Sequence, residues 1–300
     1  MMGAIVGDIV GSVYEWHNIK TKDFPLFREA CFFTDDTVMT CAVAQAVMEG
    51  GQRDAFIDAM KKYGWLYPGA GYGGRFGAWL FSESRAPYYS FGNGAAMRVS
   101  PCAWGIACGS GEGLDRWLRK GCALARASAE VTHNHPEGIK GALAAADAII
   151  LCRWYFEDGR GAQERPAHGD LAACKQHIKA HVEREYGYDL SRSLDAIRPG
   201  YCFNVTCQET VPQAIIAFLE SRDFEDAIRN AISLGGDSDT LAAITGSIAE
   251  AAYGIPDWIQ DKACSYLDKP LKDVCTRWEQ YIASLSKNPW GFGGRSPRRL

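Results

Sequence analysis

The sequence predicts an all-α protein, a single compact domain in which many helices pack across one another as an orthogonal bundle. Apolar residues recur at intervals of three and four along most of the 300 residues, as they do in helices with one buried face. Alternating apolar and polar runs bounded by turn residues, which would indicate strands, are almost absent. With helices of about 10–14 residues, a chain of this length has room for roughly ten or more of them.

The first helix is predicted at the N-terminus, where apolar side chains form a stripe over residues 5–13. Glycines recur at every fourth position from Gly3 to Gly11, so a second helix could approach this one closely. Asp8 and Glu15 lie two turns apart, and on a continuous helix both carboxylates would project from about the same face. A solvated stripe on an amphipathic helix is the simpler alternative for these two acids.

The later helices are marked by periodicity and by residues that begin or end a helix. Helical patterns follow in order at residues 38–48, 142–148, 215–219, 227–232 and 241–253. Gly50 and Gly51 end the first of these, and Pro256 follows the last. Pro136 is expected in the first turn of its helix, and Pro212 at the boundary of another.

No linker interrupts the chain, so one domain is expected over residues 1–285, followed by a C-terminal tail at residues 286–300. The polar segment at residues 159–169 is expected to be a loop within that domain. Nothing in the sequence specifies an oligomeric state.

Composition and charge exclude several classes of protein. Hydrophobic residues make up 47% of the chain, which is enough for a large core. The net charge is −4 and basic residues cluster only in the tail, so general nucleic-acid binding is not expected. The N-terminus lacks a secretory signal, and Asp147 interrupts the longest apolar stretch, so no membrane span is expected. Eleven cysteines without a Cys-x-x-Cys pair predict free thiols in a reducing, cytoplasmic location.

Two clusters of Asp and Thr, about two hundred residues apart, each lead directly into a helical pattern. They are Thr34-Asp35-Asp36-Thr37 and Asp237-Ser238-Asp239-Thr240. Helix capping would explain either cluster alone, because Ser, Thr and Asp are favoured at helix N-termini. A cap needs one oxygen, however, whereas each cluster supplies two carboxylates and at least one hydroxyl.

If the two clusters meet, four carboxylates share one site, and a divalent cation is the natural compensation for their repulsion. Neither cluster contains Cys or His, which favours Mg²⁺, Mn²⁺ or Ca²⁺ over Zn²⁺. Two such ions about 3.5–4 Å apart could polarise substrate oxygens and orient a water molecule. Asp237-x-Asp239 also matches the start of a haloacid-dehalogenase nucleophile motif and of an EF-hand loop. No strand precedes it and no later EF-hand ligands follow it, so both alternatives fail.

Taken together and in order, the motifs resemble those of the ADP-ribosylglycohydrolase family. The resemblance rests on Gly7-Asp8 through Glu15, on both Asp/Thr clusters, on residues 90–98 and on Thr132-His133. It extends from residue 3 to about residue 254. It implies an all-α fold with two Mg²⁺ ions, for which Mn²⁺ could substitute. It also implies hydrolysis of the glycosidic bond between ADP-ribose and an acceptor, which could be a protein side chain, a nucleobase or a small molecule.

The resemblance also implies roles for individual residues. The metal ligands it implies are Thr34, Asp35, Asp36, Asp237, Asp239 and Thr240. It makes Glu15 the neighbouring acid that takes or gives a proton, with Asp36 as the alternative base. The diphosphate would lie on the backbone N–H groups of a loop formed by Ser90, Phe91, Gly92, Asn93 and Gly94. Phe91 would stack on adenine, and His133 would reach the diphosphate or the ribose.

Two other functions fit the same residues. A non-hydrolytic protein of this fold would bind ADP-ribose or inhibit a transferase, although the intact set of ligands counts against it. A different two-metal hydrolase, such as a phosphoesterase, would release phosphate, but Arg98 is the one cation within the motifs. Without the resemblance, the loop at residues 90–94 would be interpreted as an ordinary turn.

Overall fold

The computed structural model describes residues 1–108, 112–156 and 170–286, and it confirms the all-α class. Within these ranges no β-strand forms, and Gly92 and Thr206 make an isolated bridge between two loops. The expected loop at residues 159–169 and the tail at residues 287–300 lie outside the described residues. None of the described helices is long and apolar enough to cross a bilayer.

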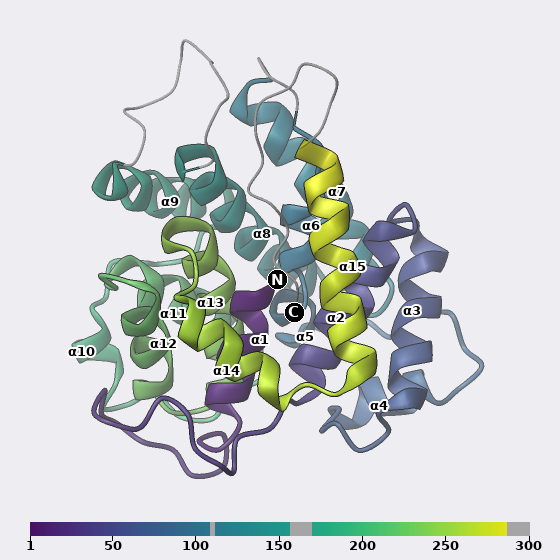
Figure 1. Cartoon of the computed structure of the whole chain (residues 1–300). Coiled ribbons are helices and arrows are strands. Elements are labelled where there is room, and N and C mark those ends of the chain that lie inside the picture. The colour runs from purple at the N-terminus through teal and green to yellow at the C-terminus, as the bar shows by residue number, and fades with distance from the viewer. Residues whose placement is uncertain (109–111, 157–169, 287–300) are drawn as a thin grey trace.

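Fifteen helices follow one another along the described chain (Figure 1). They are α1 (Met2–Gly11), α2 (Asp35–Met48), α3 (Arg53–Leu66), α4 (Gly74–Leu80), α5 (Gly94–Met97), α6 (Ser100–Trp104), α7 (Leu114–Glu130), α8 (Pro136–Phe156), α9 (Leu171–Tyr186), α10 (Leu194–Ile197), α11 (Cys207–Leu219), α12 (Phe224–Ser233), α13 (Ser238–Tyr253), α14 (Asp257–Tyr266) and α15 (Lys269–Ser286).

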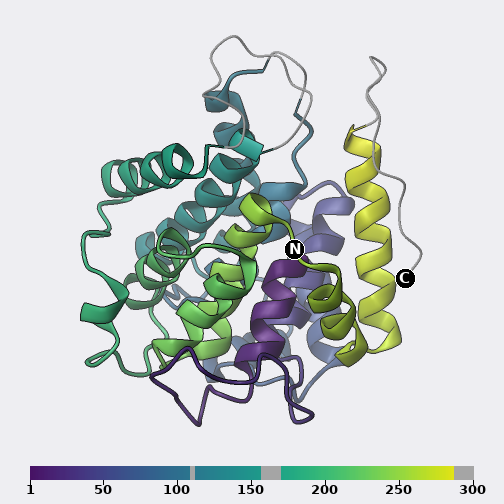
Figure 2. The same cartoon turned by 60° about the vertical axis from the view of Figure 1, so that its left-hand side comes forward.

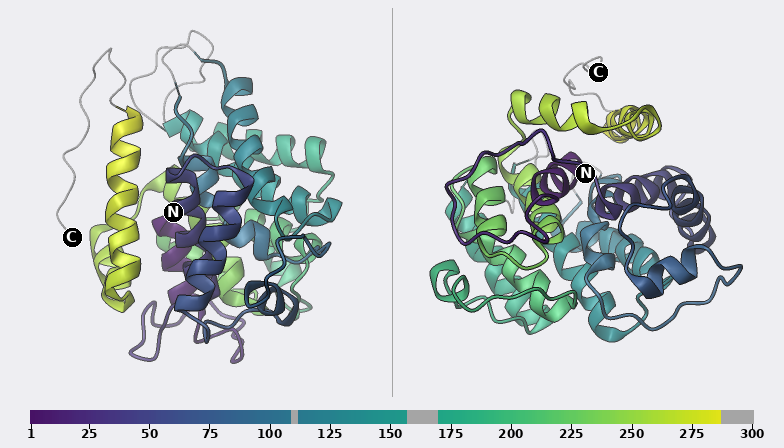
Figure 3. Two further views of the ribbon diagram at one scale, coloured as in Figure 1. Left: turned by 90° about the vertical axis from the view of Figure 1, so that its right-hand side faces the viewer. Right: turned by 90° about the horizontal axis from the view of Figure 1, so that it is seen from below.

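Helices α1 and α13 form the centre of the bundle, where they lie side by side (Figure 2). Seen from below, α14 and α15 run along the outside of α1 and α2 (Figure 3). Helix α1 is buried along its whole length, as its apolar sequence predicts. Because α13 begins at Ser238, its packing against α1 brings the second Asp/Thr cluster to the C-terminal end of α1.

Glycines on α1 permit this contact. A Cβ atom added at Gly3 would lie 2.1 Å from the carbonyl oxygen of Gly246, and one at Gly7 would lie 2.0 Å from that of Ala242. At Gly11 it would lie 2.4 Å from the Cα of Asp239. All three neighbours are backbone atoms of α13, which cannot move aside independently. The predicted close approach of a second helix is therefore confirmed.

Gly7→Ala is expected to destabilise the protein, because the added methyl group would meet the backbone of α13. Overpacking a tight core lowers the free energy of unfolding by about 1–3 kcal/mol. Because the neighbours here are rigid backbone atoms, we expect a loss at the upper end of this range. Chemical denaturation would measure the loss. Gly69→Ala is the matched control, since a Cβ there has no neighbour within 4 Å. Equal unfolding free energies for the two variants would contradict close packing of α1 on α13.

Two expectations about helix boundaries are wrong. Helix α1 ends at Gly11, so it does not include Glu15. The chain turns there because the Tyr14 N–H donates to the Gly11 carbonyl (2.8 Å), and Ser12 Oγ accepts from the Phe32 N–H (3.2 Å). Pro212 lies inside α11 rather than at its boundary. A proline near the start of a helix removes a single backbone hydrogen bond, and the buried face of α11 holds the rest in place.

Other boundary signals are confirmed. Helix α8 begins at Pro136, Gly50 and Gly51 follow α2, and Pro256 directly precedes α14. No disulfide joins cysteines within the described residues, and most of the thiols are buried.

Candidate active site

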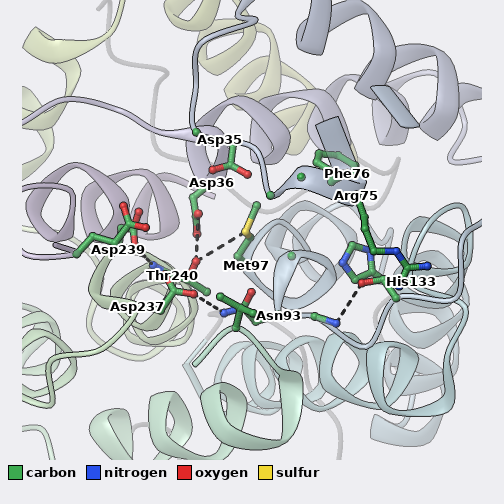
Figure 4. Close-up of a pocket in the computed structure, with 18 of the residues that line it drawn as sticks. Asp35, Asp36, Arg75, Phe76, Asn93, Met97, His133, Asp237, Asp239 and Thr240 are labelled. Atoms are coloured by element: carbon green, nitrogen blue, oxygen red, sulfur yellow. Dashed lines mark hydrogen bonds between the residues drawn. The ribbon is translucent and has the colours of Figure 1, made fainter. Parts of the chain in front are cut away.

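The two Asp/Thr clusters meet in space. Asp35 and Asp36 begin α2, while Asp237 is the N-cap of α13 and Asp239 lies in its first turn. Thr240 Oγ1 donates a hydrogen bond to Asp36 Oδ2 at 3.2 Å, which joins clusters that are 204 residues apart in the chain (Figure 4). Both helices therefore direct their N-termini, where the helix dipole favours negative charge, at one acidic site.

Asp8 connects this site to α1. Its side chain is fully buried and accepts hydrogen bonds from the N–H groups of Thr34 (2.9 Å) and Thr37 (3.1 Å). It also accepts from both threonine hydroxyls, at 2.7 Å for Thr34. Asp8 thus anchors the start of α2, whereas Glu15 lies beyond the end of α1. Its place in an apolar helix was the signal for this role, but its partners could not be read from the sequence.

Burial of the carboxylates makes their charge unfavourable. Burial raises the pKa of Asp36 and of Asp239, and repulsion between neighbouring carboxylates raises both further. Burial also raises the pKa of Asp237 to about 6, although the Asn93 Nδ2 amide, 2.7 Å away, stabilises the charged form. Asp36 Oδ1 is buried and has no hydrogen-bond partner within the described residues. Among the residues that the structure describes, no Lys or Arg forms an ion pair with these carboxylates.

Two sets of three carboxylates are arranged so that each could hold a cation. One consists of Asp8, Asp36 and Asp239, and the other of Glu15, Asp237 and Asp239; the oxygens of each set lie within 4.8 Å of one another. Asp239 belongs to both sets, so two cations would be neighbours. All the donors are oxygens, and Asp36 Oδ1 still lacks a partner. This donor set fits hard divalent cations such as Mg²⁺.

Removing divalent cations should make the stability of the protein fall as the pH rises. The pKa of these acids is raised in the folded protein, so the folded state binds their protons more tightly than the unfolded state does. Their contribution to stability is therefore fully present below pH 3.8, the ordinary pKa of Asp. It is lost as the pH rises through the folded-state values, about 6 for Asp237. The melting temperature in EDTA is therefore expected to decrease across this window, and added Mg²⁺ to restore it most at the higher pH. A melting temperature in EDTA that rises over this window would contradict the repulsion described.

Glu15 follows α1 and reaches the same site. Burial, then the charges of Asp239 and Asp8, raise its pKa to about 7, which suits a group that exchanges protons near neutral pH. Asn18 fixes the turn that carries it, donating to the carbonyl of Glu15 at 2.8 Å. The Asn18 side chain also accepts from the N–H of Gly236 (2.7 Å) and donates to its carbonyl (2.9 Å). Asn18 thereby ties the Glu15 turn to the one that precedes Asp237.

The turn before Asp237 requires glycine. Gly235 and Gly236 both have positive φ, 70° and 73°, a conformation that residues with side chains rarely adopt. The turn packs against Tyr201, whose ring lies 2.7 Å from the position of a Cβ at Gly236. Lys20 Nζ donates to the carbonyls of Tyr201 (2.6 Å) and Leu234. Neither Lys20 nor Asn18 could be assigned from the sequence, because their partners lie about two hundred residues away.

The acidic site is one end of a pocket of about 370 Å³. Figure 4 shows the carboxylates at one end, His133 and Arg75 at the other, and Asn93 between them. Several residues assigned a role from the sequence line this pocket: Glu15, Asp35, Asp36, Ser90, Gly92, Asn93, Gly94, His133, Asp237, Asp239 and Thr240. Thr34 does not line it, because its hydroxyl is bonded to Asp8.

The loop at residues 90–94 lies along the floor of the pocket, and part of its backbone is engaged within the protein. The Asn93 N–H donates to the Val205 carbonyl (2.8 Å), and the Gly92 N–H donates to Ser90 Oγ (3.2 Å). These two N–H groups are therefore not directed at a ligand. Phe91 does not line the pocket; it is 43% exposed and packs edge-on against the ring of His135, 5.3 Å away.

The far end of the pocket is less acidic. His133 is 4% exposed, and burial followed by the charges of Arg98 and Arg75 lowers its pKa well below 6.5. The ring is therefore neutral at physiological pH. The Arg75 guanidinium lies 5.0 Å from the ring of Tyr88, and both side chains line the pocket. Arg75 provides a positive charge here that the sequence motifs did not identify.

Two aromatic side chains border the pocket next to Glu15. The rings of Trp16 and Phe203 stack with centroids 5.1 Å apart and planes inclined by 22°. Trp16 is 72% exposed, which is unusual for a side chain of this size. Phe203 comes from a loop far along the chain, so this pair was also beyond reach of the sequence motifs.

Comparison with known proteins agrees with this arrangement. A family model described as ADP-ribosylglycohydrolase matches residues 1–286. The ADP-ribosylhydrolase ARH3 of Homo sapiens is 28% identical, over 85% of this chain and 84% of that protein. The glycohydrolase of ADP-ribosyl dinitrogen reductase from Rhodospirillum rubrum is 26% identical, over 95% of this chain and 94% of that protein.

The fold also matches a solved structure. A chain of an ADP-ribosylglycohydrolase-related protein complex aligns with a TM-score of 0.60, over 95% of this chain and 96% of that chain, at 23% identity. Similarity at this identity bears on the fold alone, and it agrees with the bundle described above. The family model, by contrast, covers every described residue. The chain therefore belongs to the ADP-ribosylglycohydrolase family, whose members are hydrolases of ADP-ribosyl linkages.

Proposed function

We propose that this protein hydrolyses the glycosidic bond between ADP-ribose and an acceptor in the presence of Mg²⁺, and so releases free ADP-ribose. The observation that carries the proposal is the meeting of Asp35 and Asp36 with Asp237 and Asp239 at one end of an elongated pocket. The relatives from Homo sapiens and Rhodospirillum rubrum, named as ADP-ribosyl hydrolases, support the same reaction.

The pocket has two chemically different ends, as ADP-ribose does. The acidic end would hold the ribose that carries the acceptor. Asp36, Asp237 and Asp239 belong to the carboxylate sets that could hold a cation, and Asp35 and Thr240 line the same pocket. We assign these five side chains to Mg²⁺ or Mn²⁺. When bound, these ions would supply positive charge to the ribose hydroxyls and to an attacking water. The end with Arg75 and His133 offers a cation and a neutral ring to the anionic diphosphate.

Glu15 is the residue we assign to proton transfer. Water adds to the anomeric carbon as the bond to the acceptor breaks, so one proton leaves the water and one reaches the acceptor. With a pKa of about 7, Glu15 can hold either form near neutral pH. The carboxylates around it also stabilise the positive charge that develops on the ribose in the transition state. Asp36 is the alternative base, but its hydrogen bond from Thr240 and deeper burial make it a poorer one.

The acceptor would leave past Trp16 and Phe203, which border the pocket beside Glu15. Buried thiols without a disulfide in the described chain support a reducing, cytoplasmic setting for the reaction.

A panel of defined ADP-ribosyl conjugates tests the proposal. Arginine, serine, nucleobase, O-acetyl and polymeric conjugates would each be incubated with Mg²⁺ or with EDTA, and the products separated by chromatography. At least one conjugate is expected to release ADP-ribose with Mg²⁺ and none with EDTA. Hydrolysis of the diphosphate, with AMP as the product in place of ADP-ribose, would instead identify a phosphoesterase. Tight binding of ADP-ribose without turnover of any conjugate would identify a non-hydrolytic binder.

A further inference from the structure

Arg98 is buried without a carboxylate partner, and this unusual placement leads to His133. The side chain is fully buried, and among the described residues no acid forms an ion pair with it. Its Nη2 donates to Thr132 Oγ1 at 2.8 Å and to the carbonyl of Ser128 at 3.4 Å, and its Cζ lies 5.3 Å from the ring centroid of Phe76. Burying a cation in this way is costly. A specific contact made by Arg98 should therefore matter to the site.

Thr132 connects Arg98 to His133 through two hydrogen bonds. An arginine only donates hydrogen bonds, so Thr132 Oγ1 accepts from Nη2 and keeps its own proton to donate. His133 Nδ1 lies 2.8 Å from that hydroxyl, and the described residues offer Thr132 Oγ1 no other acceptor. His133 Nδ1 is therefore the acceptor. Because the ring is neutral, its one proton must be on Nε2.

His133 Nε2 faces the loop that borders the pocket. It lies 3.2 Å from the position of a Cβ at Gly94 and 3.7 Å from one at Gly92, so the ring edge fills the space that a side chain would take. No protein acceptor pairs with Nε2 among the described residues, and His133 lines the pocket. A proton on Nε2 is thus directed at whatever occupies the space above these glycines.

We propose that Arg98 and Thr132 are positioning residues that hold His133 as the neutral tautomer protonated on Nε2, ready to donate a hydrogen bond to an oxygen of the bound ligand. The identity of that oxygen, one of the diphosphate of ADP-ribose, rests on the proposed function. The tautomer itself does not, because it follows from hydrogen bonds within the protein.

Nitrogen NMR of the histidine side chains tests the tautomer in the ligand-free protein. His133 is expected to show a protonated Nε2 and an unprotonated Nδ1. Thr132→Val removes the donor to Nδ1, so the other tautomer should gain population, and Thr132→Ser should restore the original spectrum. His135 serves as an internal reference, because its Nδ1 accepts from the N–H of Glu137 (3.1 Å) and does not depend on Thr132. A wild-type His133 protonated on Nδ1, or a Thr132→Val spectrum identical to wild type, would overturn the proposal.

Arg98→Met tests the hydrogen bond from Arg98 to Thr132. Without the guanidinium, the Thr132 hydroxyl is free to accept from Nδ1, so the Nδ1-protonated form should again gain population. If this variant does not fold, the comparison of Thr132→Val with Thr132→Ser still decides the question.

Binding of free ADP-ribose, measured by calorimetry, separates this proposal from the proposed reaction. Thr132→Val is expected to weaken binding about ten-fold, the effect of one hydrogen bond to a charged group. The affinity for Mg²⁺ should not change, because Thr132 is not among the carboxylate sets. A shifted tautomer with unchanged ADP-ribose affinity would refute the ligand contact. Failure of every conjugate to turn over would refute the hydrolase and leave the tautomer assignment standing.

Discussion

Asp239→Asn should reduce the rate of Mg²⁺-dependent ADP-ribose release by more than about a hundred-fold, since changes to residues one step removed from a metal already cost about 10–100-fold. Asp239 is the one residue that belongs to both sets of carboxylates able to hold a cation. Combining it with Asp237→Asn should abolish release. Initial rates across a Mg²⁺ titration would measure the effect.

The same variant should not destabilise the metal-free protein. The pKa of the Asp239 carboxyl is raised by burial and by the neighbouring Asp237, and Asn removes this unfavourable buried charge. The melting temperature in EDTA is therefore expected to stay equal or to rise. This separates loss of a ligand from loss of the fold. Asp189→Asn makes the same chemical change on the surface and should leave the rate unaltered. Full turnover by Asp239→Asn at low Mg²⁺ would show that the acidic cluster is not the metal site.

Glu15→Gln should leave ADP-ribose binding intact and lower kcat by about 10²–10⁴-fold, the usual contribution of a positioned acid or base. Gln keeps the size and hydrogen-bonding capacity of the side chain but cannot carry the proton. Because Glu15 also lies in one cation set, the variant would be assayed at saturating Mg²⁺.

The pH dependence of kcat gives a second measurement of Glu15. Its pKa of about 7 predicts that kcat of the wild type changes with pH as Glu15 titrates, which gives one limb of the pH profile. When Mg²⁺ is bound, this limb should lie at a lower pH, because a cation favours the carboxylate. Glu15→Gln should lose this limb. Glu29→Gln, an exposed glutamate, is the control. A variant with a normal kcat and an unchanged limb would move the proton transfer to Asp36 or to another group.

The helical architecture could be predicted because the buried face of each helix appears in its own sequence as apolar residues at intervals of three and four. The stripe beginning at Ile5 and the glycines at every fourth position of α1 are local patterns, and the close packing on α13 satisfies them directly. The two Asp/Thr clusters could likewise be recognised one at a time. Their meeting was inferred from an excess of carboxylates over what helix caps need, and the contact of Thr240 with Asp36 agrees with it.

The remaining features depend on partners that are distant in the chain. Helix α1 ends at Gly11, where Ser12 Oγ accepts from the N–H of Phe32, 20 residues away, which no periodicity in α1 reveals. The turn that carries Glu15 is held by the contact between Asn18 and Gly236, 218 residues away. Phe203 stacks on Trp16 although the two residues are 187 positions apart in the chain. Such pairings arise from tertiary structure, so a residue's type and spacing cannot specify them.

Crystals grown with Mn²⁺ and measured at the manganese absorption edge would report directly on the central claim, that residues 35–36 and 237–240 together hold divalent cations. Anomalous difference maps are expected to show two peaks about 3.5–4 Å apart, with Asp239 between them. The absence of any peak among these carboxylates at saturating Mn²⁺ would contradict the account and leave helix capping as the role of both clusters.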